Sequence, residues 1–501
     1  MNSIFLQKYI EKFESAKTGR GEIENIWEEI NEVMYGKQKQ KKELQDFTVR
    51  RCRNQLASHL QNLIITPLAP WFGISLITDH DSYNKRQEEE WSQDIEEVLL
   101  DVFNNPQSNF TSAIRQFFLG LCGYGTAILM IEENDTCPYK VFFRNVDVQE
   151  CYFEEDMQGL VNVIYRNFKM PVHQAMSSFE EASKSSFYKK IHESDRLEQI
   201  NVLHVVHPDE NKYKSIYIDI DNQTILSEGR FDYFPYFVVR QDKESSVYGY
   251  PLAANVLSKA KMLTEFDEMI VESAQNTIRP ALAIPNQGYT FPMNFKSGGI
   301  NTYQNGYADK IYPLSFSNPI SLCAEQQKCI DTIQKAFYLD VLHMSDRHEM
   351  TAAEVNVRCM EQARILAPIC ASLEFELLNP MIRGVYLSLK KFGFLPKLQG
   401  CDLNKIKVSY KSFVHKSHKA NSLAKTQDAI MFLHNTGLLR SNPELLDNID
   451  SDKLIEMLIT AGNAPKEIFK SQQEVKKIRA SRVETQREQA QRADAQEAQI
   501  M

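Results

Sequence analysis

Apolar side chains recur at helical spacing over most of the first 65 positions. One stripe runs from Ile4 to Phe13 and a second from Ile23 to Val33, with the letters TGRG between them. This spacing places the apolar side chains on one face of an α-helix, and two close glycines favour a break. A third stripe, from Leu56 to Ile64, ends before two prolines in TPLAP, which favour an extended segment. The sequence therefore predicts three helices followed by extended chain.

The pattern changes between Phe142 and Val239 to short runs of β-branched and aromatic residues separated by turn residues. Examples are LVNVIYRNF, INVLHVVHP, KSIYIDID and YFPYFVVRQ. Such runs are typical of strands in a sheet. A helical pattern at about 171–193 interrupts them, so we expect a mixed region built around a sheet.

The second half is predicted to be mostly helical. One helix is expected between Pro251 and Pro280, because a proline is favoured where a helix begins and cannot continue it at the end. Residues 281–322 are rich in Gly, Asn, Pro and aromatic side chains, which indicates a compact non-helical insert. A second helix is expected at about 324–342.

A long helix is predicted to begin at Thr351. Thr351 and Glu354 have the T-x-x-E spacing of a capping box, and Met350 and Val355 have the spacing of a hydrophobic staple. These paired signals mark the start of a helix more firmly than propensity alone.

The same helix is expected to run to about Phe392, where Gly393 and then Pro396 favour a stop. Pro368 and Pro380 lie inside it, and each removes a backbone hydrogen bond, so we expect kinks at both. A helix with two prolines is costly in isolation. It is easier to explain when neighbours hold both of its faces, as in an oligomer.

The last segment, residues 471–501, contains no aromatic and few large apolar side chains. Taken alone it would be a marginal helix or disordered chain. Packed against copies of itself in an oligomer, the segment could instead form a bundle of helices.

Composition narrows the class of protein. A chain of 501 residues with 43% hydrophobic side chains can bury cores for two to four domains. Its 57 basic and 66 acidic residues give a net charge of −9, which argues against a wide nucleic-acid surface. Any DNA contact must be local or weak, and the basic run KQKQKK at 37–42 is more typical of a solvated helix face than of a nucleic-acid patch.

Redox and membrane signals favour an intracellular soluble protein. The nine cysteines include no CxxC pair, which indicates free thiols in a reducing cytosol rather than a disulfide or zinc framework. The N-terminus lacks the apolar core of a signal peptide, and no apolar run is expected to approach the roughly 18 residues of a membrane span.

Motifs for catalysis are absent from the sequence. It contains no phosphate-binding loop, no nucleophile elbow and no HExxH. The glycines of GLCGYGTAILM at 120–130 predict a tight turn between a helix and a strand. His204 and His207 in HVVH would point to opposite faces of a strand, so they do not predict a metal site. We expect no catalytic residue, metal or cofactor.

One segment, HMSDRHEMTAAEV at 343–355, places two histidines and several charges directly before the long helix. One interpretation is a catalytic loop with His343 or His348 as general base. The other is a loop that touches a long charged partner without holding it tightly.

Five sequence blocks identify a family resemblance over roughly residues 20–435. They are RCRNQLASHLQNLIITPLAPWFGISL, GYGTAILMIEE, NVLHVVHP, YGYPLAANVLSKAKMLTEFDEMIVESAQNTIRPALAIP and EMTAAEVNVRCMEQARILAPICASLEFELLNPMIRGVYLSLKKFGFLP. In this order they resemble the head-to-tail connector, or portal, proteins of short-tailed, T7-like bacteriophages (podoviruses). The first and last blocks carry most of the specificity.

This resemblance implies an α+β, mainly α, portal-protein fold that assembles as a ring of about twelve subunits around double-stranded DNA. It implies an N-terminal wing region at 1–250 with a mixed α/β part, stem helices at 251–280 and 323–338, a clip at 281–322, a tunnel loop at 339–350, a long kinked wing helix at 351–396, wing and helical crown at 397–470, and a C-terminal crown or barrel tail at 471–501.

The resemblance also implies two functional surfaces. The tunnel loop would face the DNA channel with His343, Ser345, Asp346, Arg347, His348 and Glu349. The clip would dock partners with Phe291, Asn294, Lys296, Tyr303 and Tyr307. From Asp340 to Glu349 the sequence has three acidic residues and one arginine. Because each added cation tightens DNA binding, this balance predicts a mostly repulsive collar with a few isolated donors.

The predicted function is therefore a non-enzymatic portal ring at one capsid vertex of the virion, made in the host cytoplasm. Its implied partners are the terminase, tail adaptor proteins, the capsid, and internal core or scaffolding proteins, with no membrane. The alternatives are an ATP-driven DNA-packaging enzyme or nuclease subunit, and a monomeric interaction protein. An ATPase assay and the particle size in solution would separate these hypotheses.

Overall fold

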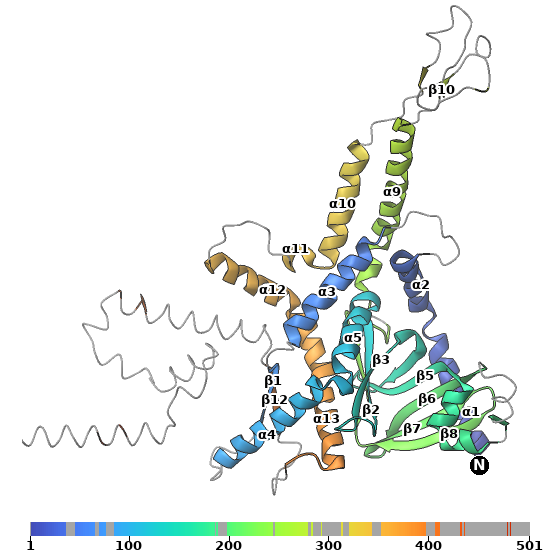
Figure 1. The fold of residues 1–501 in the computed structure, drawn as a ribbon, viewed down its shortest axis with the longest axis vertical. Helices are drawn as coiled ribbons and strands as arrows, with labels where there is room; N and C mark the ends of the chain where they lie inside the picture. The colour runs from blue at the N-terminus through green and yellow to red at the C-terminus, as the bar shows by residue number, and fades with distance from the viewer. Residues whose placement is uncertain are drawn as a thin grey trace, which may run out of the picture. The chain divides into compact units, whose positions relative to one another are not determined.

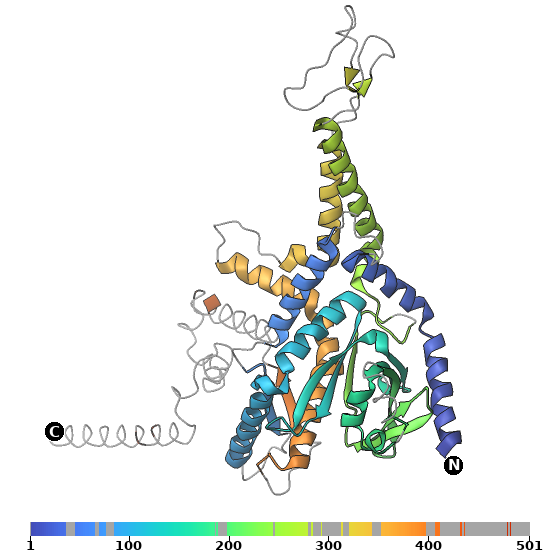
Figure 2. The same ribbon diagram turned by 45° about the vertical axis from the view of Figure 1, so that its right-hand side comes forward.

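The structure is a computed structural model that describes most of the chain up to residue 410. The described ranges are 2–36, 46–65, 70–76, 85–185, 187–188, 198–243, 246–278, 282–283, 292, 312–313, 320–342, 352–396, 406–410 and the isolated positions 431–432, 435, 478 and 481. The chain divides into two compact units, Met1–Ser412 and Phe413–Met501. All elements discussed below belong to the first unit (Figures 1 and 2).

The N-terminal part is helical, as predicted. Its helices are α1 (Asn2–Thr18), α2 (Gly21–Tyr35), α3 (Thr48–Ile64), α4 (Lys85–Asn104) and α5 (Phe110–Tyr124). The break between α1 and α2 falls within TGRG, and α3 ends before the two prolines. Phe13, Trp27 and Leu60 are buried, which confirms the core-facing stripes.

Two antiparallel sheets follow in the region where strands were predicted. The three-stranded sheet has the order β3 (Val141–Val146), β2 (Thr126–Glu133), β9 (Tyr236–Arg240). The five-stranded sheet runs in chain order through β4 (Cys151–Glu155), β5 (Val161–Pro171), β6 (Gln199–Asp209), β7 (Lys212–Asp219) and β8 (Thr224–Phe231). The predicted helical interruption is present as α6 (Val172–Ser178) and α7 (Glu180–Lys184).

The glycines at 120–130 form the tight turn that was expected. Gly125 has a φ of 72° and follows the last residue of α5, directly before β2. A Cβ atom at Gly125 would lie 2.6 Å from the backbone carbonyl of Tyr250, so only glycine fits there. The turn packs backbone against backbone, which leaves no phosphate cradle.

An aromatic core joins the helices to the first sheet. Trp71 packs against Phe103, Phe103 against Phe110, and Phe110 against Phe143, with ring centroids 4.7–5.3 Å apart. A second core lies where α1 covers the five-stranded sheet, with Phe13 beside Tyr165 and Leu203. These two cores hold the N-terminal helices against the two sheets.

A long-range strand pair was not predicted. β1 (Phe72–Leu76) pairs antiparallel with β12 (Ile406–Tyr410), with Phe72 opposite Tyr410. The pair ties the chain after the long helix back to the N-terminal region. Ile406–Tyr410 falls within the segment assigned to wing and crown.

Two helices of the second half lie side by side and extend away from the sheets (Figures 1 and 2). They are α9 (Leu257–Ile278), which follows a 3₁₀ turn at Leu252–Val256, and α10 (Ile320–Ala336). Between them the structure describes one short antiparallel pair, β10 (Leu282–Ala283) and β11 (Tyr312–Pro313). α10 thus begins three residues earlier than the predicted second stem helix, and α11 (Leu339–Leu342) makes the first part of the predicted tunnel loop helical.

The long helix is present in three parts, α12 (Ala352–Leu373), a π-helical turn (Glu374–Leu378) and α13 (Asn379–Phe392). α12 continues through Pro368 without interruption. Pro380 has no N–H to give the carbonyl of Glu376, and the preceding Asn379 N–H bonds the carbonyl of Glu374, five residues back. The predicted disturbance at Pro380 is therefore a π-turn.

The end of the long helix agrees with the prediction. Gly393 has a φ of 77°, and Phe394 N–H bonds the carbonyl of Leu389, which closes the helix as glycine C-caps do. Met360–Phe392 is long and apolar enough to cross a membrane by length and composition, so the expectation that no run approached this length was wrong. Of its apolar window 39% is buried, and Met381 and Val385 are fully buried, so we interpret the α13 part of this stretch as packed against the protein core.

Candidate functional site

The residues predicted to act lie outside the described residues. This holds for His343, Ser345, Asp346, Arg347, His348 and Glu349 of the tunnel loop, and for Phe291, Asn294, Lys296, Tyr303 and Tyr307 of the clip. Thr351 of the capping box lies outside them too. The structure instead describes the elements that flank both segments.

The first of these elements is the stem pair, α9 and α10. Near its base, Leu263, Ile333 and Phe337 are fully buried. Further out, Gln326 Nε2 donates to Asp267 Oδ1 over 2.5 Å, and burial raises the pKa of the Asp267 carboxyl. In the described stretches 264–275 and 322–328 no side chain is buried. The outer half of the pair therefore has little core of its own.

The second element is the contact between α11 and α12, the helices that flank the predicted tunnel loop. α11 ends at Leu342 and α12 begins at Ala352. Gln362 of α12 donates its Nε2 to the carbonyl of Val341 over 2.7 Å, which satisfies an acceptor at the open end of α11. α11 also contacts α3. The hydrogen bond therefore ties the end of α11 to the middle of α12, ten residues beyond Ala352.

The third element fixes the π-turn to the sheets through Arg240 at the end of β9. The Arg240 side chain is 3% exposed and pairs with the carboxylates of Glu155 and Glu376. Glu376 Oε1 accepts from Arg240 Nη2 over 2.7 Å, and its Oε2 accepts from Arg240 N–H over 2.9 Å. Two strands and the long helix thus meet at one buried guanidinium.

The histidines of HVVH face opposite sides of β6, as predicted. His204 is fully buried, with its Nδ1 2.6 Å from Tyr236 Oη and its Nε2 2.8 Å from Ser215 Oγ. Burial lowers the pKa of His204 to about 3, because the charged form loses its hydration. His207 Nε2 lies 2.9 Å from Tyr9 Oη on α1. Both histidines therefore have structural partners.

Over the described residues, no three His, Cys, Asp or Glu side chains gather as a metal site would require. Seven of the cysteines in the described ranges are free thiols, among them Cys52, Cys122 and Cys151. Burial raises the pKa of the Cys122 thiol to about 12, so it is not a reactive nucleophile.

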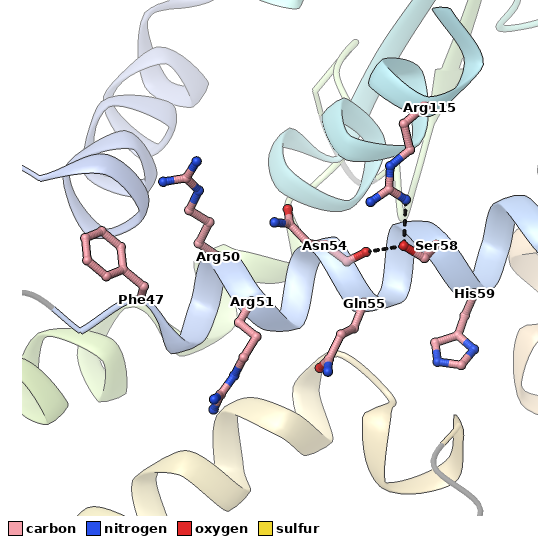
Figure 3. Close-up of a pocket in the computed structure, with 8 residues that line it drawn as sticks. All are labelled: Phe47, Arg50, Arg51, Asn54, Gln55, Ser58, His59 and Arg115. Atoms are coloured by element: carbon pink, nitrogen blue, oxygen red, sulfur yellow. Dashed lines mark hydrogen bonds between the residues drawn. The ribbon is translucent and has the colours of Figure 1, made fainter. Parts of the chain in front are cut away.

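A basic groove on α3 was missed by the sequence reasoning. It is a cavity of about 540 Å³ lined by Phe47, Arg50, Arg51, Asn54, Gln55, Ser58, His59 and Arg115. Figure 3 shows these side chains along α3, with Arg115 reaching over from α5. Arg115 Nη1 donates to Ser58 Oγ over 2.7 Å. The sequence RRCRNQLASH at 50–59 could have predicted this groove, because polar residues repeat in it at four-residue spacing and would form rows along a helix.

Comparison with known proteins agrees with this architecture. The model of the family described as bacteriophage head to tail connecting protein matches residues 6–469. The portal protein of Salmonella phage epsilon15 is 24% identical over 472 residues, which cover 87% of this chain and 82% of that protein. The probable portal protein of Bordetella phage BPP-1 is 24% identical over 474 residues, covering 88% and 82% respectively. The family match spans the stem pair, the α3 groove and the long helix, and the chain belongs to the bacteriophage head to tail connecting protein family, a structural family and not an enzyme family.

Proposed function

We propose that this protein forms the portal ring of a bacteriophage, with about twelve copies at one capsid vertex surrounding a channel for double-stranded DNA. The family match over residues 6–469 carries this proposal. The ring would serve DNA packaging and later ejection. It would bind the terminase during packaging and tail adaptor proteins afterwards. It would also contact the capsid and internal core or scaffolding proteins.

The stem pair supports a ring, because its outer half lacks burial within one chain. Met262, Met269 and Val271 of α9 are exposed apolar side chains on this half or at its base. A closed ring repeats one head-to-tail contact, so each copy covers a different face of the next. Apolar side chains that are exposed in the isolated subunit would then be covered by neighbours.

Native mass spectrometry of the purified full-length chain tests the ring directly. We expect closed oligomers of about twelve subunits and no ATP hydrolysis. A stable, monodisperse monomer would contradict the ring. ATP turnover or nuclease activity by the pure protein would favour the alternative of a packaging enzyme.

Reversing the charge of Asp346 tests the channel-facing role of residues 343–349. Asp346 is chosen because it lies outside the capping box predicted at Thr351. Asp346→Lys changes the charge by +2 per subunit, or roughly +24 in a ring of about twelve, and cations tighten DNA binding through counterion release. We expect normal rings, slower DNA ejection, and recovery as salt is raised. Glu181→Lys on α7, an exposed carboxylate beside the sheet, is the matched control.

For that segment, ejection at the parental rate by Asp346→Lys particles at all salt concentrations would end the channel assignment while leaving the ring intact. Slowing by the Glu181→Lys control to the same extent would point to a general charge effect instead.

The docking role of the clip is proposed from its place as an insert between α9 and α10 and from its aromatic residues, which are enriched at interfaces. Replacing residues 290–308 by a short Gly/Ser linker removes Phe291, Tyr303 and Tyr307. We expect intact rings that no longer bind tail adaptor proteins in co-sedimentation. Undiminished adaptor binding would rule out the clip as the docking surface.

A further inference from the structure

The α3 groove concentrates positive charge in an otherwise acidic protein. The chain has a net charge of −9, yet residues 37–53 contain seven Lys or Arg and two Asp or Glu. The groove residues form two rows at four-residue spacing on α3, Arg50–Asn54–Ser58 and Arg51–Gln55–His59 (Figure 3). From one end of a row to the other is roughly 12 Å at 1.5 Å per residue.

The arginines of the groove lack the partners that other arginines have. Arg144, Arg166 and Arg230 each pair with a carboxylate at 2.8–3.1 Å. In the described part of the chain, no carboxylate lies within salt-bridge distance of Arg50, Arg51 or Arg115, and none lines the groove.

The contacts that the groove arginines do make leave their donors available. Arg50 lies over the ring of Tyr35, with its guanidinium 5.1 Å from the ring centroid, and Arg115 gives one N–H to Ser58. Arg50 and Arg51 are both exposed. Uncompensated guanidinium groups lining one cavity indicate an anionic ligand from outside the chain.

The neighbouring donors indicate which anion. Arginine forks match phosphate oxygens, and Asn, Gln and Ser side chains are common additional donors to a nucleic-acid backbone. A span of roughly 12 Å equals the rise of three to four nucleotides at about 3.4 Å per strand. α3 also contacts α10 and α11, the helices that lead into the predicted channel-facing segment.

We propose that the α3 groove binds backbone phosphates of double-stranded DNA through Arg50, Arg51 and Arg115, independently of base sequence. This inference rests on the proposed function, since it supplies the proposed ring with cationic DNA contacts beyond Arg347, the one arginine of the acidic segment 340–349. The groove would hold the backbone at a local site, while the collar predicted from residues 340–349 stays mostly repulsive.

The test compares two full-length variants of equal charge change. Arg50→Gln/Arg51→Gln removes two cations from the groove, and Arg144→Gln/Arg230→Gln removes two exposed, ion-paired cations elsewhere. Rings are confirmed by native mass spectrometry, and binding of a short duplex of mixed sequence is then measured over a salt series. We expect the groove variant to bind at least about tenfold more weakly at low salt, with the salt slope smaller by about 0.9 for each phosphate that the variant no longer neutralises.

The control variant is expected to keep the parental slope, and Arg50→Lys/Arg51→Lys to keep most of it, because a cation remains. Parental rings that bind no duplex would refute the phosphate site, whereas a stable parental monomer in native mass spectrometry would refute the proposed function. Parental binding with an unchanged slope in the groove variant would refute only the phosphate site. Loss of rings in the Gln variant, with the chain still folded by circular dichroism, would assign the arginines to carboxylates of a neighbouring subunit and also refute it.

Discussion

The sheet region, residues 126–240, and the stem pair, α9 and α10, solve the problem of stability in different ways. In the sheet region β2 buries six of its eight residues and β6 six of its eleven, and even His204 and Asp219 are fully enclosed. In the stem pair the described outer stretches bury none. The sheet region is therefore a self-sufficient core, whereas the stem pair depends on contacts that one chain cannot provide.

Polar groups sharpen this contrast. Within the sheet region, the buried side chains of His204 and Asp219 each have two or more partners: Asp219, for example, accepts from Tyr188 Oη and from Asn222. Buried groups of this kind are costly to leave unpaired, so they specify one arrangement of strands. Along the stem, charged side chains such as Glu265 and Glu268 face outward. The sheet region is thus restricted to one arrangement of strands, whereas the exposed side chains of the stem pair remain available for contacts with neighbouring subunits.

The largest expected effect comes from breaking the buried ion pairs of Arg240. Arg240→Ala leaves the carboxylates of Glu155 and Glu376 without their guanidinium, which should cost about 3–5 kcal/mol of unfolding free energy. Urea denaturation measures this cost. Arg230→Ala, whose side chain is 67% exposed and paired with Asp209, should change stability by less than about 1 kcal/mol.

That prediction would be contradicted by equal losses in the two Arg variants. Equal losses would mean that the π-turn is held to the sheets by apolar packing alone, and that burial does not separate the two ion pairs.

The second effect is a pH dependence that belongs to the sheet region. The folded pKa of His204 is about 3, below the ordinary value of 6.5, so the unfolded chain binds more protons than the folded chain between these values. The stabilising contribution is complete above pH 6.5 and is lost as the pH falls toward 3. The free energy of unfolding should fall by up to about 1.4 kcal/mol per pH unit in this window.

Urea unfolding of the parent and of His204→Gln between pH 7 and 5 isolates this effect, because the carboxylates are common to both. We expect a steeper fall for the parent. Parallel curves would show that His204 has the same pKa in both states.

Local patterns predicted much of this fold, because the spacing of apolar residues within each helix marks the face that is buried. The stripes ending at Phe13 and Ile64, the turn at Gly125 and the C-cap at Gly393 depend on residues a few positions apart. The pairing of β1 with β12 does not, since Phe72 and Tyr410 are brought together only by the whole intervening fold. No periodicity in either short strand specifies its partner.

The candidate site divides in the same way. The polar rows of α3 were visible in the sequence, but the absence of nearby carboxylates among the described residues is a tertiary property of α3 and α5. Likewise Pro380 predicted a disturbed helix, while the use of the resulting π-turn to place Glu376 beside Arg240 required the sheet. The acidic segment before Thr351 was recognised from its charges, and its role remains a prediction.

A smaller effect is expected where the stem pair meets the long helix. Gln362→Ala removes the hydrogen bond to the carbonyl of Val341 and should cost about 0.5–1.5 kcal/mol. Faster amide hydrogen exchange in α11 would report the missing hydrogen bond. Gln327→Ala on the exposed face of α10 is the control, and equal exchange in both variants would mean that Gln362 does not stabilise α11.

The smallest effect within one chain is expected at Met269, and it tests the contrast most directly. Met269 on α9 is 48% exposed, so Met269→Ala should change the unfolding free energy of the dilute subunit by less than about 0.5 kcal/mol. Leu263→Ala, at a fully buried position of the same helix, should cost about 2–5 kcal/mol because it leaves a cavity. If neighbours cover the outer stem, Met269→Ala should instead raise the protein concentration at which rings form, as mass photometry would show. The buried position would then matter for folding and the exposed one for assembly. An unchanged assembly concentration for Met269→Ala would mean that this part of the stem stays open in the ring, and that the absence of a core there serves something other than contact between subunits.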